Sequence, residues 1–139
     1  MKKLSLMIAM GIACSIAIAK PGTNVSQFET YSQQMQQMSA KYVADKKFDY
    51  ASKTTEKWLE TYNSLSEKDK ANYNSIFSDI MYNQACAYAQ TNELYKALKA
   101  LKNAVNAGYS NASQIQNDEN LTSLKQFDEF KKIVKSIKS

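Results

Sequence analysis

The chain of 139 residues is long enough for one domain, and its formal net charge of +5 comes from lysine alone, because it contains neither arginine nor histidine. Without arginine or a concentrated basic stripe, the sequence does not favour nucleic acid as a partner. Without histidine, with scattered carboxylates and with only three isolated glycines, it offers no catalytic residue, no metal site and no phosphate-binding loop, so we expect a non-enzymatic protein without a cofactor.

Residues 1–19 have the pattern of a secretory signal peptide. Lys2 begins a basic head, an apolar run follows, and Ala17-Ile18-Ala19 supplies the small residues of a cleavage site. The apolar run is shorter than the about twenty residues that span a membrane. We therefore predict an exported protein, periplasmic or extracellular, with a disordered leader at residues 20–25 and a helical domain at residues 26–139.

The two cysteines leave one alternative open. Cys14 follows small residues, so a lipid attached there would anchor the protein to the envelope, although the apolar residues 15–19 are unusual for a tether. A membrane anchor is expected only if Cys14 is lipidated. Cleavage after Ala19 removes Cys14 and leaves Cys86 without a disulfide partner. Because alanines flank Cys86 on a predicted helix, we expect it to be a small buried apolar residue.

The first half of the domain predicts two helices. In residues 26–45, apolar side chains recur at spacings of three and four, which is the stripe of a helix. These side chains are Phe28, Tyr31, Met35, Met38 and Tyr42. After a turn at Lys46-Lys47, one side of a second helix carries Phe48, Ala51, Thr55, Trp58, Leu59, Tyr62 and Leu65. The alternative is a homo-oligomer, in which Phe28, Met35 and Met38 form an interface instead of core.

The middle of the chain predicts a second helical pair. Ser66, with Asp69 three residues on, indicates a helix cap. The third helix then has about twenty residues by its apolar stripe. Its stripe is Tyr73, Ile76, Phe77, Ile80, Met81, Ala85 and Tyr88. Thr91-Asn92 leads into a fourth helix at residues 93–107, and Gly108 ends it because glycine takes the left-handed conformation without steric cost.

The C-terminal part predicts two short helical turns, at residues 110–116 and 118–124, with Asp118 as a helix cap. A last helix at residues 126–137 follows. The apolar side chains expected to face inward are Leu124, Phe127, Phe130, Ile133, Val134 and Ile137. Since no segment alternates with a period of two, the fold class is all-α: two stacked helix-turn-helix hairpins plus a C-terminal capping helix.

Residues 82–108 resemble a repeat of the tetratricopeptide-repeat (TPR) family, a helix-turn-helix unit with small and aromatic positions. Ala85 and Tyr88 stand at the small and aromatic positions of its first helix. The second helix matches through its small, large and small residues, Ala97, Leu101 and Ala104.

A weaker upstream copy begins 46 residues earlier, because Tyr42 corresponds to Tyr88 and Ala51 to Ala97. Trp58 stands where the family has a small residue, so we expect the first hairpin to pack at a different angle or distance. Downstream, the pattern of Asn117-Asp118, Leu121, Leu124 and Phe127 resembles the tail that often closes bacterial proteins of this type.

The resemblance implies a peptide-binding surface, since the first helix of each hairpin lines a concave face in this family. The residues expected on that face are Gln33, Gln36, Gln37, Tyr82, Asn83 and Gln90. Asn83 matches an asparagine with which some members hold a peptide backbone. Because the cationic residues of a carboxylate clamp are missing, we expect a neutral, hydrogen-bonding groove. In the alternative, Tyr82 and Asn83 only form hydrogen bonds at the junction between the two hairpins and do not contact a peptide.

Two functions follow from these features. The first is an exported, non-enzymatic helical-repeat module that binds a protein or peptide. The second is an envelope-associated structural or assembly protein, held to the membrane by lipid or by the outward-facing lysines of the last predicted helix, which are Lys131, Lys132, Lys135 and Lys138. Release by osmotic shock would favour the first, and dependence on detergent for extraction would favour the second.

Overall fold

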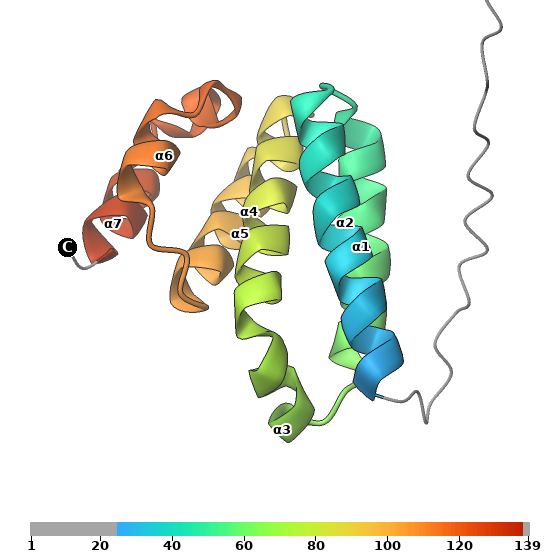
Figure 1. The fold of residues 1–139 in the computed structure, drawn as a ribbon. Helices are drawn as coiled ribbons and strands as arrows, with labels where there is room; N and C mark the ends of the chain where they lie inside the picture. The colour runs from blue at the N-terminus through green and yellow to red at the C-terminus, as the bar shows by residue number, and fades with distance from the viewer. Residues whose placement is uncertain (1–24, 138–139) are drawn as a thin grey trace, which may run out of the picture.

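A computed structural model describes residues 25–137, and every regular element in this range is helical (Figure 1). The predicted all-α fold is therefore confirmed. The predicted signal peptide and residues 20–24 of the leader lie outside the described residues, whereas Val25 is the first residue of a helix. Among the described residues, no helix combines the length and the apolar character that crossing a bilayer requires.

The first hairpin consists of α1 (Val25–Ala44) and α2 (Phe48–Asn63), joined by a turn in which Lys46 has a φ of 57°. Phe28 and Met35 are buried within the chain, so these two belong to the core and not to an interface between copies. Their burial follows from the stripe spacing, which turns one face of α1 toward α2 and α4. Met38 is half-buried, and the homo-oligomer itself stays a prediction.

Trp58 of α2 is fully buried against α1. Its indole Nε1 donates a hydrogen bond to Oγ of Ser32, at 2.9 Å, and Ser32 is fully buried as well. The small serine side chain on α1 thus faces the large ring on α2 and accepts its only polar hydrogen.

The long third helix of the prediction is interrupted. The segment forms α3 (Glu67–Lys70), η1 (Ala71–Tyr73) and α4 (Asn74–Gln90). Ser66 caps α3 as predicted, with its Oγ accepting from the Asp69 amide. The break has a packing cause: Tyr73 leaves helical geometry, with φ −112° and ψ 13°, and its ring packs edge-on against Phe28 at 4.8 Å between centroids.

The second hairpin consists of α4 and α5 (Leu94–Asn106), and its turn places Asn92 at a φ of 63°. Gly108, at a φ of 113°, ends α5 as predicted. The next amide, that of Tyr109, turns back and donates to the Ala104 carbonyl at 2.9 Å, which satisfies one of the free carbonyls at the helix end.

The C-terminal cap contains α6 (Ala112–Asn117), η2 (Glu119–Leu124) and α7 (Asp128–Ser136), close to the predicted ranges. The η2 turn packs on α4 and α5, and α7 packs on α5. Leu121 and Leu124 of η2 and Phe130 and Ile133 of α7 are buried, so the cap covers the outer side of the second hairpin.

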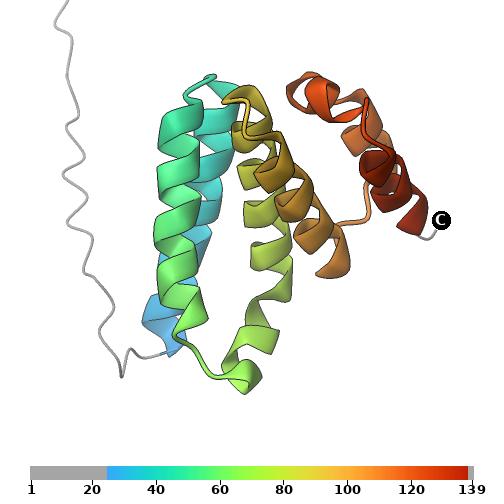
Figure 2. The same ribbon diagram turned by 180° about the vertical axis from the view of Figure 1, so that it is seen from behind.

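Helix α4 is the centre of the molecule, because it packs against α1, α2, α5 and η2. All side chains from Ile80 to Ala87 are buried. Figure 1 shows α1 and α4 on one side of the stack, and Figure 2 shows α2 and α5 on the opposite side. The two sides offer different surfaces to solvent.

Candidate functional site

Two of the predicted peptide-binding residues, Tyr82 and Asn83, point into the molecule. Tyr82 is 5 % exposed and Asn83 is 9 % exposed. The Asn83 amide donates to Oγ of Ser39 on α1 at 3.0 Å, and Ser39 in turn donates to the Gln36 carbonyl at 2.9 Å. The amide of Asn83 therefore joins α4 to α1. This bond matches the alternative in which Asn83 serves the junction between the hairpins instead of a bound peptide.

Tyr82 is held on its other side by the C-terminal cap. Its hydroxyl donates to Oδ2 of Asp118 at 2.5 Å, and its ring stacks on that of Tyr109 with centroids 4.4 Å apart. Oδ1 of Asp118 accepts from the Asn120 amide at 2.8 Å, so Asp118 caps η2, as the sequence predicts. One carboxylate thus ties the start of η2 to the middle of α4.

Cys86 lies beside the same carboxylate and is fully buried, as expected. Its Sγ lies 3.6 Å from Oδ2 of Asp118, to which the thiol donates. Burial, and after it the negative charge of Asp118, raise the pKa of the Cys86 thiol well above its ordinary value. A thiol that is buried and held in its neutral form is a poor nucleophile.

The remaining predicted site residues are spread along one side of the stack. Gln33 and Gln37 are exposed on α1, and Gln36 is half-buried and donates to Oδ2 of Asp79 at 2.5 Å. Gln90 is exposed at the end of α4 and donates to the Asn120 carbonyl at 3.0 Å. Four of the six predicted site residues, namely Gln36, Tyr82, Asn83 and Gln90, thus use their polar groups to join α1 or the cap to α4.

Helices α2 and α5 lie on the opposite side of the stack (Figure 2). An open groove with a volume of about 660 Å³ lies between these two helices. We call it the α2–α5 groove. Its rim on α2 is formed by Glu56, Leu59, Glu60 and Asn63. Its rim on α5 is formed by Lys96, Lys99, Ala100 and Asn103. Its floor is formed by residues of α4, namely Phe77, Met81, Gln84 and Tyr88.

The residue spacing explains why these side chains share one groove. Both rims repeat the spacing i, i+3, i+4 and i+7, which is one face of a helix. The α2 rim is acidic through Glu56 and Glu60, and the α5 rim is basic through Lys96 and Lys99. The groove therefore has an apolar floor between two walls of opposite charge.

A polar network closes the end of the groove near Tyr88. The Tyr88 hydroxyl donates to Oε1 of Glu56 at 2.8 Å and accepts from the Gln84 amide at 3.2 Å. Burial and the Glu56 carboxylate raise the pKa of Tyr88 above its ordinary value. Lys96 pairs with Glu93 and lies over the Tyr88 ring, 5.4 Å from its centroid. By contrast, Glu60 and Lys99 form no ion pair with any residue between 25 and 137.

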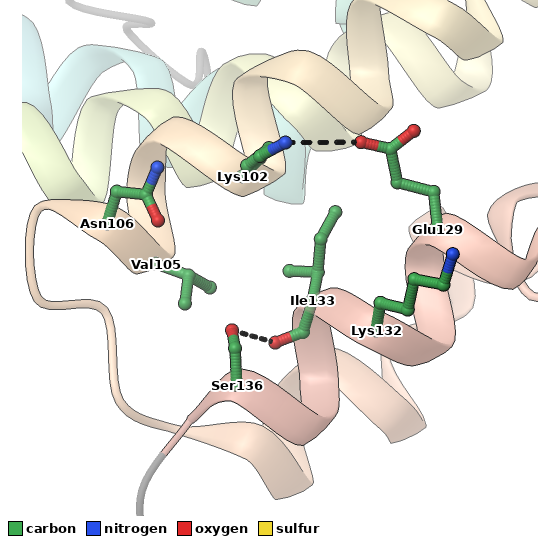
Figure 3. A pocket seen from close by; sticks show the side chains of 7 residues that line it. All are labelled: Lys102, Val105, Asn106, Glu129, Lys132, Ile133 and Ser136. Carbon is green, nitrogen blue, oxygen red and sulfur yellow. Dashed lines mark hydrogen bonds and ion pairs between the residues drawn. The ribbon is translucent and has the colours of Figure 1, made fainter.

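Two smaller cavities lie elsewhere. One, of about 440 Å³, lies between facing side chains of α5 and α7 (Figure 3). Val105 and Ile133 line it, and an ion pair between Lys102 and Glu129, at 3.6 Å, crosses its edge. The other, of about 360 Å³, is a polar hollow beside Asp79 and the loop after α5. Within the described part of the chain, acidic and cysteine side chains nowhere gather in a group that could hold a metal ion.

The groove residues are absent from the set that the sequence predicts. The predicted peptide-binding surface lies on the first helix of each hairpin, α1 and α4, whereas the groove lies between the second helices, α2 and α5. A signal was nevertheless available: Glu56 and Glu60 are four residues apart on one predicted helix, and Lys96 and Lys99 are three apart on another. The packing that sets these two faces opposite each other could not be read from either helix alone.

Comparison of the chain with known protein families, with curated proteins and with solved structures gives no match. The geometry of the α2–α5 groove is therefore the basis on which a function is proposed.

Proposed function

We propose that this protein is an exported, non-enzymatic helical-repeat module of TPR-like type that binds a protein or peptide partner. The observation that supports this proposal is the α2–α5 groove, because an open hollow with apolar side chains at its floor suits an inserted segment of another chain. The buried, neutral Cys86 thiol and the absence of histidine argue against nucleophilic catalysis.

The proposed binding surface differs from the one that the sequence predicts, because it lies between α2 and α5 and not on α1 and α4. A partner at Tyr82 and Asn83 would have to displace their bonds to Asp118 and Ser39, which join separate elements of the fold. Breaking a buried hydrogen bond and leaving a partner unsatisfied costs about 1–3 kcal/mol. In the α2–α5 groove, Glu60 and Lys99 form no ion pair within residues 25–137 that a partner would have to break. We therefore propose that the partner binds there and not on the α1 and α4 side.

A capture experiment tests the proposal. The full chain is expressed with an affinity tag in its native cells, and proteins that co-purify in stoichiometric amounts from the envelope fraction are measured. Asn63→Trp places a large ring at the mouth of the groove, and we expect it to abolish capture. Lys57→Trp is the matched control, because Lys57 is exposed on the same helix and does not line the groove.

The outcomes separate the parts of the proposal. If no stoichiometric protein co-purifies with the wild type, the binding function is wrong. If a partner is captured equally by wild type and Asn63→Trp, the function stands and the groove is not its site.

Export is proposed on the pattern of residues 1–19, which lie outside the described residues. Mass spectrometry of the mature protein tests it, and we expect an N-terminus at Lys20. A diacylated Cys14 would instead support the lipid-anchored, structural alternative.

A further inference from the structure

We infer that the occupant of the α2–α5 groove is an amphipathic helix of a partner protein, with basic residues along one flank and acidic residues along the other. The inference rests on the proposed binding function and adds the chemistry of the partner.

The shape of the groove suits a helix. The α2 rim extends from Glu56 to Asn63, and seven residues of helix rise about 10 Å, which equals about two turns of a partner helix lying parallel to it. Half-buried Leu59 of the α2 rim and half-buried Phe77 of the floor offer apolar surface inside the groove. A partner helix meets such a floor with apolar side chains at i, i+3 or i+4, and i+7.

The charges fix the flanks of that helix. Glu56 and Lys96 are already engaged, by Tyr88 and Glu93 respectively, so they add little attraction for a partner. Glu60 and Lys99 have no ion-pair partner within residues 25–137 and are exposed on opposite rims. A helix between them gains on both sides only when its flank toward α2 is basic and its flank toward α5 is acidic.

A second copy of this chain fits less well. A two-fold axis along the groove would set each acidic rim against a basic rim, which satisfies the charges. Both surfaces would then be concave, however, and the hollow of about 660 Å³ in each copy would stay unfilled. Interfaces pack as densely as protein interiors, so a convex helix is the better complement.

Three synthetic helical peptides serve as probes. They share length and a leucine stripe at the spacing given above, and they differ only in their flanks: lysine with glutamate, lysine on both sides, or glutamate on both sides. A peptide with its two flanks exchanged is no control, because it can lie in the groove in the opposite direction. Binding to the full chain is measured by fluorescence anisotropy at two ionic strengths.

We expect the wild-type protein to prefer the mixed-flank peptide by roughly two- to fivefold over either single-charge peptide, with a smaller margin at high salt. Glu60→Lys leaves an unpaired cation on each rim, because Glu56 stays bonded to Tyr88, and should shift the preference to the glutamate-flanked peptide. Lys99→Glu leaves an unpaired anion on each rim, because Lys96 stays paired with Glu93, and should shift the preference to the lysine-flanked peptide. Lys57→Glu, the matched control outside the groove, should keep the wild-type order.

Three results would overturn the inference: no binding of any peptide by the wild type, an order of affinities that both rim substitutions leave unchanged, or a wild-type dimer in sedimentation that Lys99→Glu dissociates. The last result would assign the groove to a second copy. Because the capture experiment with Asn63→Trp does not depend on flank charge, it can still support the binding function when the peptide experiment fails.

Discussion

At the scale of single residues, buried polar side chains decide how the helices fit together. Ser32 accepts from Trp58, and Ser39 accepts from Asn83, so the serines of α1 act as small contact points for larger groups on α2 and α4. Both serines are fully buried. Each pair combines tight packing with a satisfied hydrogen bond, which a purely apolar stripe could not provide.

The Ser32 and Trp58 pair gives a measurable coupling. Trp58→Phe leaves the serine hydroxyl without its donor, and Ser32→Ala leaves the indole N–H without its acceptor, so each should lower the free energy of unfolding by about 1–3 kcal/mol. The loss of unfolding free energy in the double variant should be about 1 kcal/mol smaller than the sum of the two single losses, because neither polar group of the pair is then left without its partner. Urea unfolding of the four proteins measures the cycle. Strict additivity would show that the hydrogen bond does not contribute.

At the scale of elements, turns are fixed by residues that accept a positive φ. The turn of the first hairpin uses Lys46 at 57°, the second uses Asn92 at 63°, and Gly108 at 113° ends α5. The glycine faces open space, since an added Cβ would meet no atom within 4 Å. Any cost of an added Cβ at Gly108 therefore comes from the backbone conformation alone.

The positive φ of Gly108 predicts how an added methyl group at this position changes stability. Gly108→Ala should lower the free energy of unfolding by about 1–2 kcal/mol, because an L-residue is strained at this φ. Asn92→Gly, in the other turn, should change stability little, because glycine adopts that φ readily. Urea denaturation of both variants provides the comparison. An unchanged midpoint for Gly108→Ala would mean that the loop relaxes to a negative φ.

The buried face of α5 predicts a larger effect. Ala97 is fully buried where α5 meets α4. Ala97→Asp places a charge there without a partner, so we expect a loss of about 3 kcal/mol or more and an unfolded or largely destabilised protein. Lys99→Asp, on the exposed side of the same helix, is the control. A thermal midpoint that Ala97→Asp leaves unchanged would show that this position is not at the crossing.

At the scale of the whole molecule, the C-terminal cap is joined to the hairpins by tyrosines as well as by apolar contacts. Tyr82 reaches Asp118 in the cap, and Tyr109 stacks on Tyr82. Burial, together with the hydrogen bond to Asp118 and the negative charge of that carboxylate, raises the pKa of Tyr82 above its ordinary value. Burial, followed by the charge of Asp79, raises the pKa of Tyr109 to about 12.

These shifts predict how stability depends on pH. The folded state holds the protons of Tyr82, Tyr88 and Tyr109 to a higher pH than the unfolded chain, in which tyrosine has a pKa of about 10. Their contribution is complete below pH 10 and is lost as the pH rises from there through the folded-state pKa values. Absorbance at the tyrosinate band should therefore rise later in the native than in the urea-unfolded protein. Coincident titration curves would contradict this account of the three tyrosines.

The sequence by itself determined the helices, most of their ends and much of the core. Spacings of three and four predicted α1, α2, α4, α5 and α7, and Asn92 and Gly108 marked turns, because these signals depend on local backbone and side-chain geometry. The burial of Cys86 and the cap at Asp118 also followed from near neighbours in the chain.

Only the tertiary structure decided which polar groups remain for a partner. Tyr82 and Asn83 carry suitable hydrogen-bonding groups, but Asp118 and Ser39, which are 36 and 44 residues away in the chain, bind them inside the molecule. The packing of Tyr73 on Phe28 likewise breaks a helix that its own sequence would continue. The α2–α5 groove exists because α4 holds two charged helix faces apart, and contacts between such distant residues leave no periodic pattern in a single sequence.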